Sequence, residues 1–234
     1  MGYVHSIETM GLVDGPGIRV VVFMQGCKLR CKFCHNPDTW FINKNLEITT
    51  EELVNRIRKF RPYFEESGGG VTFSGGEPLM QSTFLKETLK LSKKAGINTC
   101  VDTSGTGYLK EDLDEIFKWT DLFLVDVKAV DEDKYKELTG LEMDEFNYFK
   151  EQLNKSNKPI WIRQVIIPGI NDTKEYILQL KEYIKTFNNV LKVELLPYKD
   201  LGVSKYQKLG IKYSLEGVKP LSEERLNELK ELLN

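Results

Sequence analysis

The sequence predicts an α/β fold built around a parallel sheet, because short buried strands alternate with amphipathic helices along most of its length. Each predicted strand is rich in β-branched and aromatic residues, as strands buried on both faces usually are. The six predicted strands are residues 19–25, 70–74, 97–102, 122–127, 160–167 and 190–196. Six units are too few to close the usual eight-stranded barrel, so we expect residues 1–234 to form a single domain with a partial (β/α)6 barrel.

The segments between these strands are polar and charged, and their apolar residues have helical spacing. The predicted helices are residues 50–64, 83–94, 111–119, 144–154 and 174–187. Local signals mark some helix ends: Thr49 and Glu52 have the spacing of a capping box, and Gly96 follows two lysines at a helix end. Ser222, which precedes two glutamates, marks the start of a last helix.

The composition excludes several kinds of partner. The 33 basic and 35 acidic residues give a net charge of -2, which is too weak a field to bind nucleic acid non-specifically. No apolar run approaches the roughly 18 residues that a membrane-spanning helix needs, and the N-terminus lacks the pattern of a secretory signal. We therefore expect a cytoplasmic protein that binds neither nucleic acid nor membrane. We also expect it to be a monomer.

Three of the four cysteines, Cys27, Cys31 and Cys34, lie within eight positions. This spacing in a chain without a secretory signal indicates a metal site rather than disulfides. Three thiolates can hold three irons of a four-iron, four-sulfur cluster and leave the fourth iron open. A zinc site with His35 as the fourth ligand is the alternative that these residues leave open. Cys100 lies inside a predicted strand and is expected to be a small buried side chain.

Other unusual residues are concentrated where the predicted strands end. They are residues 75–78 (Gly-Gly-Glu-Pro) after the second strand, residues 102–105 (Asp-Thr-Ser-Gly) after the third, Asp126 and Lys128 at the end of the fourth, and residues 197–199 (Pro-Tyr-Lys) after the sixth. In parallel α/β folds ligands bind at this edge of the sheet, because the loops there converge on one opening. We therefore expect a ligand site formed by the cysteines and these residues.

The cysteine spacing, followed by His35-Asn36-Pro37, and the later Gly-Gly-Glu motif resemble the radical S-adenosylmethionine superfamily. Further stretches are similar to the pyruvate formate-lyase activating enzymes and run in order through essentially the whole chain. These stretches are residues 14–19, 27–36, 67–72, 99–103, 161–163 and 194–198. The resemblance implies a radical SAM core with six barrel units, in agreement with the strand count.

The same resemblance implies an activity. A [4Fe-4S] cluster would cleave S-adenosylmethionine to methionine and a 5′-deoxyadenosyl radical, which would abstract a hydrogen atom from a glycine of pyruvate formate-lyase. Reduced flavodoxin or ferredoxin would supply the electron. The cysteine loop runs to Thr49 without further cysteines, whereas some related activases carry a ferredoxin-like insertion there. This difference favours the formate-lyase branch.

The resemblance also implies roles for individual residues. Cys27, Cys31 and Cys34 would hold the cluster that donates the electron. Contacts to S-adenosylmethionine are implied for Phe33, His35, Gly75, Gly76, Glu77, Asp102, Asp126, Lys128, Arg163 and Lys199, with Asp102 and Asp126 also near a monovalent cation. Asp14, Gly15 and Gly17 would contact the partner's glycine loop. The chain departs from the family pattern at Lys199, where a histidine is usual.

Two functions of other classes are kept as alternatives. A zinc-dependent barrel hydrolase would use the three cysteines and His35, although four protein ligands suit a structural zinc better than a catalytic one. A one-electron carrier without a substrate would leave the Gly-Gly-Glu motif and the pair of Asp126 and Lys128 without a role.

Overall fold

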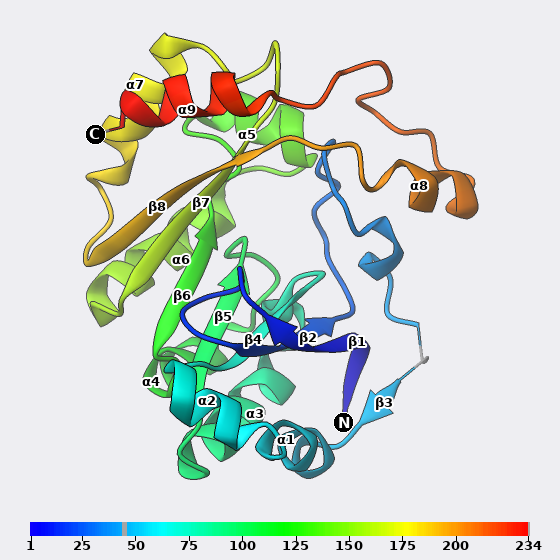
Figure 1. Cartoon of the computed structure of the whole chain (residues 1–234), viewed down its shortest axis with the longest axis vertical. Coiled ribbons are helices and arrows are strands. Elements are labelled where there is room, and N and C mark those ends of the chain that lie inside the picture. Colours follow the sequence, from blue (N-terminus) through cyan, green and yellow to red (C-terminus); the bar gives the residue numbers. More distant parts are fainter. Residues whose placement is uncertain (44–45, 234) are drawn as a thin grey trace.

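The computed structural model describes residues 1–43 and 46–233, which form an eight-stranded sheet flanked by helices (Figure 1). The strand order is β3-β1-β2-β4-β5-β6-β7-β8. Six strands pair in parallel: β2 (Arg19–Met24), β4 (Gly70–Gly75), β5 (Asn98–Thr103), β6 (Leu122–Asp126), β7 (Ile160–Ile166) and β8 (Val190–Pro197). The sheet stays open between its edges β3 and β8, so the predicted partial barrel with six parallel strands is confirmed.

Two strands were not predicted, and both pair antiparallel. β1 (Gly2–Gly11) lies beside β2, and β3 (Glu47–Ile48) pairs with β1 at the edge of the sheet. β1 is interrupted by polar residues such as His5 and Glu8, and much of it is only half-buried. It therefore lacks the continuous apolar run that identified the other strands, and the sheet is mostly but not wholly parallel.

The helices follow the predicted order with two differences. They are α1 (Thr50–Arg58), α2 (Arg61–Ser67), α3 (Ser82–Lys94), α4 (Leu113–Trp119), α5 (Glu132–Thr139), α6 (Asp144–Ser156), α7 (Lys174–Ile184), α8 (Val203–Leu209) and α9 (Glu223–Glu231). The single helix predicted over residues 50–64 is wrong, because Pro62 has no N–H to donate and its ring would collide with the carbonyl group of residue 58. α5 and α8 were not predicted, so two helices rather than one separate β6 from β7.

The predicted helix-end signals are confirmed. The Thr49 hydroxyl accepts a hydrogen bond from the Glu52 N–H, and the Glu52 carboxylate accepts one from the Thr49 N–H at 3.0 Å. Gly96 follows α3 with a φ of +73°, and Ser222 caps α9. Within residues 1–43 and 46–233, no helix combines the length and the apolar character required to cross a bilayer.

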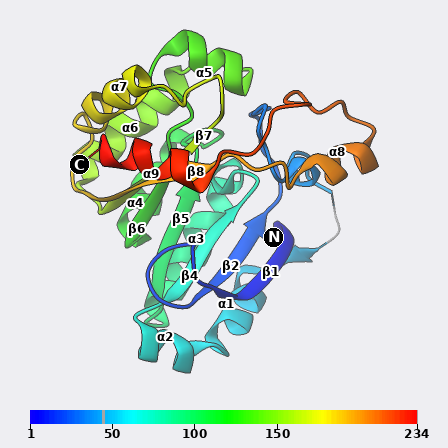
Figure 2. The ribbon, with the colours of Figure 1, turned by 45° about the horizontal axis from the view of Figure 1, so that its top comes forward.

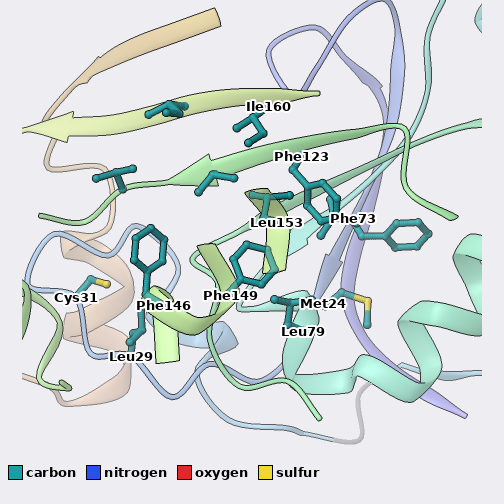
Figure 3. Close-up of a cluster of buried hydrophobic side chains, with 14 of the residues drawn as sticks. Met24, Leu29, Cys31, Phe73, Leu79, Phe123, Phe146, Phe149, Leu153 and Ile160 are labelled. Carbon is teal, nitrogen blue, oxygen red and sulfur yellow. The ribbon is translucent and has the colours of Figure 1, made fainter. Parts of the chain in front are cut away.

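Alternate strand residues face opposite sides of the sheet and enter different hydrophobic clusters. On the helix side, Phe123 of β6 meets Phe149 of α6, with their rings 6.1 Å apart and edge to face, and Phe73 of β4 belongs to the same cluster (Figure 3). On the inner side of the open barrel, Cys100 packs in a small separate cluster with Leu124, so its predicted burial is confirmed. The larger of these two hydrophobic clusters therefore lies on the helix side of the sheet.

Phe149→Ala should lower the free energy of unfolding by about 3–5 kcal/mol, because it removes a fully buried ring and leaves a cavity. Phe149→Leu should cost clearly less, since it keeps most of the buried volume. Urea unfolding of the metal-free protein, followed by circular dichroism, measures both losses. Equal losses for the two variants would show that packing volume does not determine the effect.

Candidate active site

A loop of residues 27–36, here called the cysteine loop, follows β2 and borders a pocket at the carboxyl ends of the parallel strands. Cys27, Cys31 and Cys34 line this pocket as free thiols. Seven other residues predicted for the site line it too: Phe33, His35, Gly75, Gly76, Asp102, Asp126 and Lys128. The structure thus brings ten of the predicted residues together at one place.

α5 holds the cysteine loop from one side through backbone hydrogen bonds. The Arg30 N–H donates to the Thr139 carbonyl oxygen at 2.8 Å, and the Lys32 N–H donates to the Leu138 carbonyl oxygen at 2.9 Å. Because these bonds join main chain to main chain, they fix the path of the loop between its first and last cysteines.

α8 holds the cysteine loop from the other side. The Lys205 ammonium donates to the Asn36 side-chain oxygen at 2.8 Å and to the Asp38 carboxylate at 3.0 Å. Gly202, which precedes α8, lies so close that an added Cβ would stand 2.8 Å from the Cys34 carbonyl oxygen. Both ribbon views place the loop between α5 and α8 (Figures 1 and 2).

The three thiols are in surroundings that disfavour a bare negative charge. Burial raises the pKa of Cys27 and of Cys31 to about 12, although the Lys128 ammonium opposes the shift at Cys31. Burial also raises the pKa of Cys34, against a hydrogen bond from the Asn36 N–H. Thiolates at these positions therefore need additional positive charge, which a metal centre provides.

The arrangement fits an iron-sulfur cluster better than a single zinc ion. Among the residues that the structure describes, no three His, Cys, Asp or Glu side chains surround one point closely enough to hold one metal ion. His35 Nε2 lies 2.8 Å from the Lys199 carbonyl oxygen, so this nitrogen donates to the backbone. Three thiols that border one pocket without converging on a point suit a larger, multi-iron group.

Asp102 has an acceptor position that no described group fills. Its Oδ2 accepts a hydrogen bond from the Ser74 hydroxyl at 2.6 Å and lies 3.6 Å from Arg163 Nη1. Its Oδ1 is buried and has no hydrogen-bond partner within the described residues. Burial raises the pKa of Asp102 to about 6, although Arg163 opposes the shift, and the neighbouring Asp126 raises it further. A cation beside this carboxyl group would satisfy the free oxygen.

The Lys128 side chain contributes a positive charge to the pocket. Its ammonium lies 2.7 Å from Asp126 Oδ2 and 5.6 Å from the centre of the Phe33 ring. Burial lowers the pKa of Lys128, but Asp126 and Cys31 outweigh that effect and raise the pKa overall. Lys128 is therefore a charged donor between the cysteine loop and the end of β6.

The Glu77 side chain does not line the pocket, which leaves the backbone contact that the resemblance implies for the Gly-Gly-Glu motif a prediction. It is buried, and its carboxylate accepts hydrogen bonds from the Leu79 N–H, the Thr103 hydroxyl, and the N–H and hydroxyl of Ser104 at 2.5–3.0 Å. These bonds tie the turn after β4 to the end of β5. Glu77 therefore positions the neighbouring glycine backbone.

The two glycines before Glu77 are required by close packing. Gly75 has a φ of +108°, and an added Cβ would stand 2.4 Å from the Met24 backbone nitrogen. At Gly76 an added Cβ would stand 2.4 Å from the Gly26 carbonyl oxygen. The backbone atoms of both residues therefore line the pocket without a side chain to cover them, so a ligand can contact them closely.

Arg163 and Lys199 do not line the pocket either. Arg163 reaches it only through Asp102, while its Nε donates to Glu194 at 3.1 Å and its Nη2 donates to the Val13 carbonyl oxygen. The Lys199 side chain is exposed, and its backbone carbonyl orients His35. Both residues thus reach the pocket through a neighbour, and their predicted contacts with the cofactor stay predictions.

Residues 12–18, here called the inner loop, cross the inner side of the sheet in front of β4 and β5 (Figure 1). The Asp14 carbonyl oxygen accepts a hydrogen bond from the Thr72 hydroxyl of β4 at 2.6 Å. Gly15 has a φ of +123°, and Gly17 packs against Gly69, where an added Cβ would stand 2.5 Å from the backbone nitrogen. The three residues predicted to contact a partner thus belong to this loop and lie outside the pocket.

Five residues that line the pocket were not predicted as individual site residues. They are Leu29, Asn36, Ser74, Thr103 and Ser104. Thr103 and Ser104 belong to the strand-end group that the sequence indicated, although no role was assigned to them, and Ser74 lies at the end of its strand in the same way. Nothing in the sequence distinguishes Leu29 from an ordinary core residue.

Known proteins resemble this chain over its full length. The family model of the radical SAM superfamily matches residues 21–184. A pyruvate formate-lyase-activating enzyme of Clostridium pasteurianum is 51% identical over 233 residues, which covers 100% of this chain and 97% of the relative. An enzyme of the same name from Staphylococcus epidermidis is 48% identical over 239 residues and covers 100% of this chain and 95% of the relative.

Solved structures agree with these matches. A crystal structure of a domain of pyruvate-formate lyase-activating enzyme from Bacteroides vulgatus superposes with a TM-score of 0.57 at 27% identity, covering 71% of this chain and 93% of that one. Streptococcus suis SuiB bound to its precursor peptide SuiA superposes with a TM-score of 0.67 at 20% identity, covering 93% and 46%. The second likeness concerns the fold alone. The chain belongs to the radical SAM superfamily and, within it, to the family of pyruvate formate-lyase-activating enzymes.

Proposed function

We propose that this chain uses a [4Fe-4S] cluster and S-adenosylmethionine to install a glycyl radical on pyruvate formate-lyase. The observation that carries the proposal is the single pocket in which three thiols meet a bare glycine backbone and the pair of Asp126 and Lys128. A zinc hydrolase would need thiols that converge on one point. A simple electron carrier would not need the glycine backbone or the pair of Asp126 and Lys128.

Cys27, Cys31 and Cys34 would hold three of the four irons. Cys100 lies in a separate cluster on the inner side of the sheet, so it does not supply a fourth thiolate. When bound, the cluster supplies the electron that splits S-adenosylmethionine into methionine and a 5′-deoxyadenosyl radical. The residues of the chain bind and orient the molecule for that step.

Each part of the pocket suits one part of S-adenosylmethionine. The backbone oxygens of Gly75 and Gly76 would accept from the amino group of its methionine part, while Lys128 would bind the carboxylate of that part. Phe33 and His35 would border the nucleoside. The ring position of His35 is set by the Lys199 carbonyl oxygen.

A monovalent cation beside Asp102 and Asp126 completes the proposed site. Both carboxyl groups line the pocket, and the Asp126 charge contributes to the raised pKa of Asp102. The unfilled Asp102 Oδ1 supplies an oxygen ligand, which is the kind that such ions prefer. The cation would also favour the nearby carboxylate of S-adenosylmethionine.

The partner's glycine must reach the pocket as part of an extended segment. The inner loop offers the exposed side chains of Leu12 and Val13 beside Asp14, which suits contact with such a segment. We take reduced flavodoxin or ferredoxin as the electron donor. We also infer that the chain works as a cytoplasmic monomer.

The decisive experiment mixes reduced, cluster-loaded protein with S-adenosylmethionine and pyruvate formate-lyase under anoxic conditions. A glycyl doublet in the electron paramagnetic resonance (EPR) spectrum is expected. Cys31→Ala should abolish both the doublet and the release of 5′-deoxyadenosine, because one iron loses its ligand. Cys100→Ala is the matched control and should keep both, and a doublet that survives in Cys31→Ala would refute the proposed site.

Lys128→Met should weaken binding of S-adenosylmethionine by about tenfold or more, because it removes a charged hydrogen bond worth about 1.5–3 kcal/mol. Equilibrium dialysis with labelled S-adenosylmethionine measures the change. Lys150→Met serves as the control, since Lys150 lies over the rings of Tyr183 and Phe187 away from the pocket. Equal affinities for all three proteins would remove Lys128 from the binding site.

Glu77→Gln should change how stability depends on pH. Burial raises the pKa of Glu77 from its ordinary value of 4.5 to about 7, although the hydrogen bonds from Ser104 and Thr103 oppose the shift. A raised carboxyl pKa favours folding at low pH, so this group's contribution to stability falls as the pH rises from about 4.5 to 7.

Urea unfolding of the metal-free wild type and of Glu77→Gln between pH 4.5 and 8 tests this. The difference between their unfolding free energies should change across that window and level off above pH 7. Asp102 titrates in both proteins and cancels in the difference. A constant difference at every pH would show that Glu77 titrates alike in the folded and unfolded chain.

A further inference from the structure

Arg19, at the start of β2, is a fully buried arginine beside the inner loop. Its guanidinium donates hydrogen bonds to the Pro16 carbonyl oxygen at 3.4 Å, the Thr72 hydroxyl at 2.9 Å and the Asn98 side chain at 2.9 Å. A further bond goes to the Val71 carbonyl oxygen, so every one of these acceptors is uncharged. A buried guanidinium is costly to remove from water, so bonds that join the inner loop to β4 and β5 indicate a task for this charge.

Thr72 of β4 extends the connection from Arg19 to a second point of the inner loop. Its hydroxyl accepts the bond from Arg19 Nε and donates at 2.6 Å to the Asp14 carbonyl oxygen. The side chain is fully buried, so water does not compete for either bond. A hydroxyl both donates and accepts, whereas a valine of the same shape does neither. Arg19 and Thr72 together therefore hold the backbone of residues 14–16.

The points at which the inner loop is held lie close to the cofactor pocket. Side chains two residues apart face the same side of a strand, so Thr72 lies on the same face of β4 as Ser74, about 6.6 Å nearer the start of the strand. Ser74 lines the pocket. On β5, Asp102 lines the pocket, and an added Cβ at Gly15 would stand 3.7 Å from Cys100 Sγ. A partner segment that reaches the pocket along the inner side of the sheet therefore runs past this loop.

We propose that Arg19 and Thr72 are positioning residues for the partner's glycine, because they fix the backbone of residues 14–16 against which the partner's extended segment lies. This inference rests on the proposed function. The described residues that line the cofactor pocket include neither of them, so the effect concerns the partner and not S-adenosylmethionine. A loop already held in one conformation loses less entropy when a partner binds. Releasing the loop should therefore weaken binding of the partner.

Thr72 allows a matched pair of variants. Thr72→Val keeps the shape of the side chain but removes the hydroxyl, and with it both bonds. Thr72→Ser keeps the hydroxyl and loses a methyl group instead. Thr88→Val is a control elsewhere in the fold: Thr88 of α3 is equally buried, and its hydroxyl donates to the Phe84 carbonyl oxygen of the same helix at 2.8 Å.

The first test follows glycyl-radical formation by EPR at increasing concentrations of pyruvate formate-lyase, with cluster-loaded protein and saturating S-adenosylmethionine. Thr72→Val should raise the KM for pyruvate formate-lyase by about tenfold, because it leaves the Asp14 carbonyl oxygen and Arg19 Nε without their partner. Its kcat and its affinity for S-adenosylmethionine should stay near those of wild type. Thr72→Ser and Thr88→Val should keep the wild-type KM. Misfolding or poor loading would instead lower kcat at an unchanged KM, since it only reduces the active fraction.

The second test observes the inner loop without measuring activity. Cys100 is fully buried next to Gly15, so its reaction with N-ethylmaleimide reports opening of the loop. In anoxic, cluster-loaded protein the other three cysteines are engaged by the cluster. Peptide mass spectrometry should show faster modification of Cys100 in Thr72→Val than in wild type, Thr72→Ser or Thr88→Val.

A wild-type KM in Thr72→Val would overturn the inference. An equal rise of the KM in Thr72→Ser would do so too, because packing and not hydrogen bonding would then be the cause. A wild type that cleaves S-adenosylmethionine but forms no glycyl radical on pyruvate formate-lyase would instead overturn the proposed function itself.

Discussion

The burial of three cysteine thiols at one end of a parallel sheet is the constraint on which the rest of the site depends. Burial raises the pKa of all three, so the loop needs a positive partner before its thiols act as ligands. Lys128 supplies part of that charge at Cys31, and a metal cluster would supply the rest. Three thiols can bind one cluster only if the backbone between them keeps a fixed path. The hydrogen bonds from α5 and α8 hold the cysteine loop in such a path.

The sequence was sufficient to predict the parallel strands of the sheet and the candidate site residues at their carboxyl ends. Strands buried on both faces have continuous apolar runs, and a strand end has a fixed place in the fold, so Asp102 and Asp126 could be located. α5 and α8 could not be found in this way. They are short and largely polar, and their role depends on contacts with the cysteine loop that no local pattern records.

The roles of single side chains were harder to predict than their positions. Glu77 stands where the motif predicts, yet its carboxylate faces Thr103 and Ser104 and not the pocket. Arg163 is likewise at the end of the expected stretch but reaches the pocket through Asp102. In both cases the direction of the side chain depends on partners far away in the sequence, which spacing alone does not reveal.

A continuous set of contacts connects the inner loop with the cofactor pocket. The Val13 carbonyl oxygen accepts from Arg163, Arg163 faces Asp102, and Asp102 accepts from Ser74 at the pocket wall. The residues implied separately for partner and cofactor are therefore joined through one buried guanidinium group. Asp102 Oδ1 has no hydrogen-bond partner among the described residues, so a cation bound there would also change the charge that Arg163 faces. Arg163 therefore joins the backbone of the inner loop to a carboxyl group at the pocket wall.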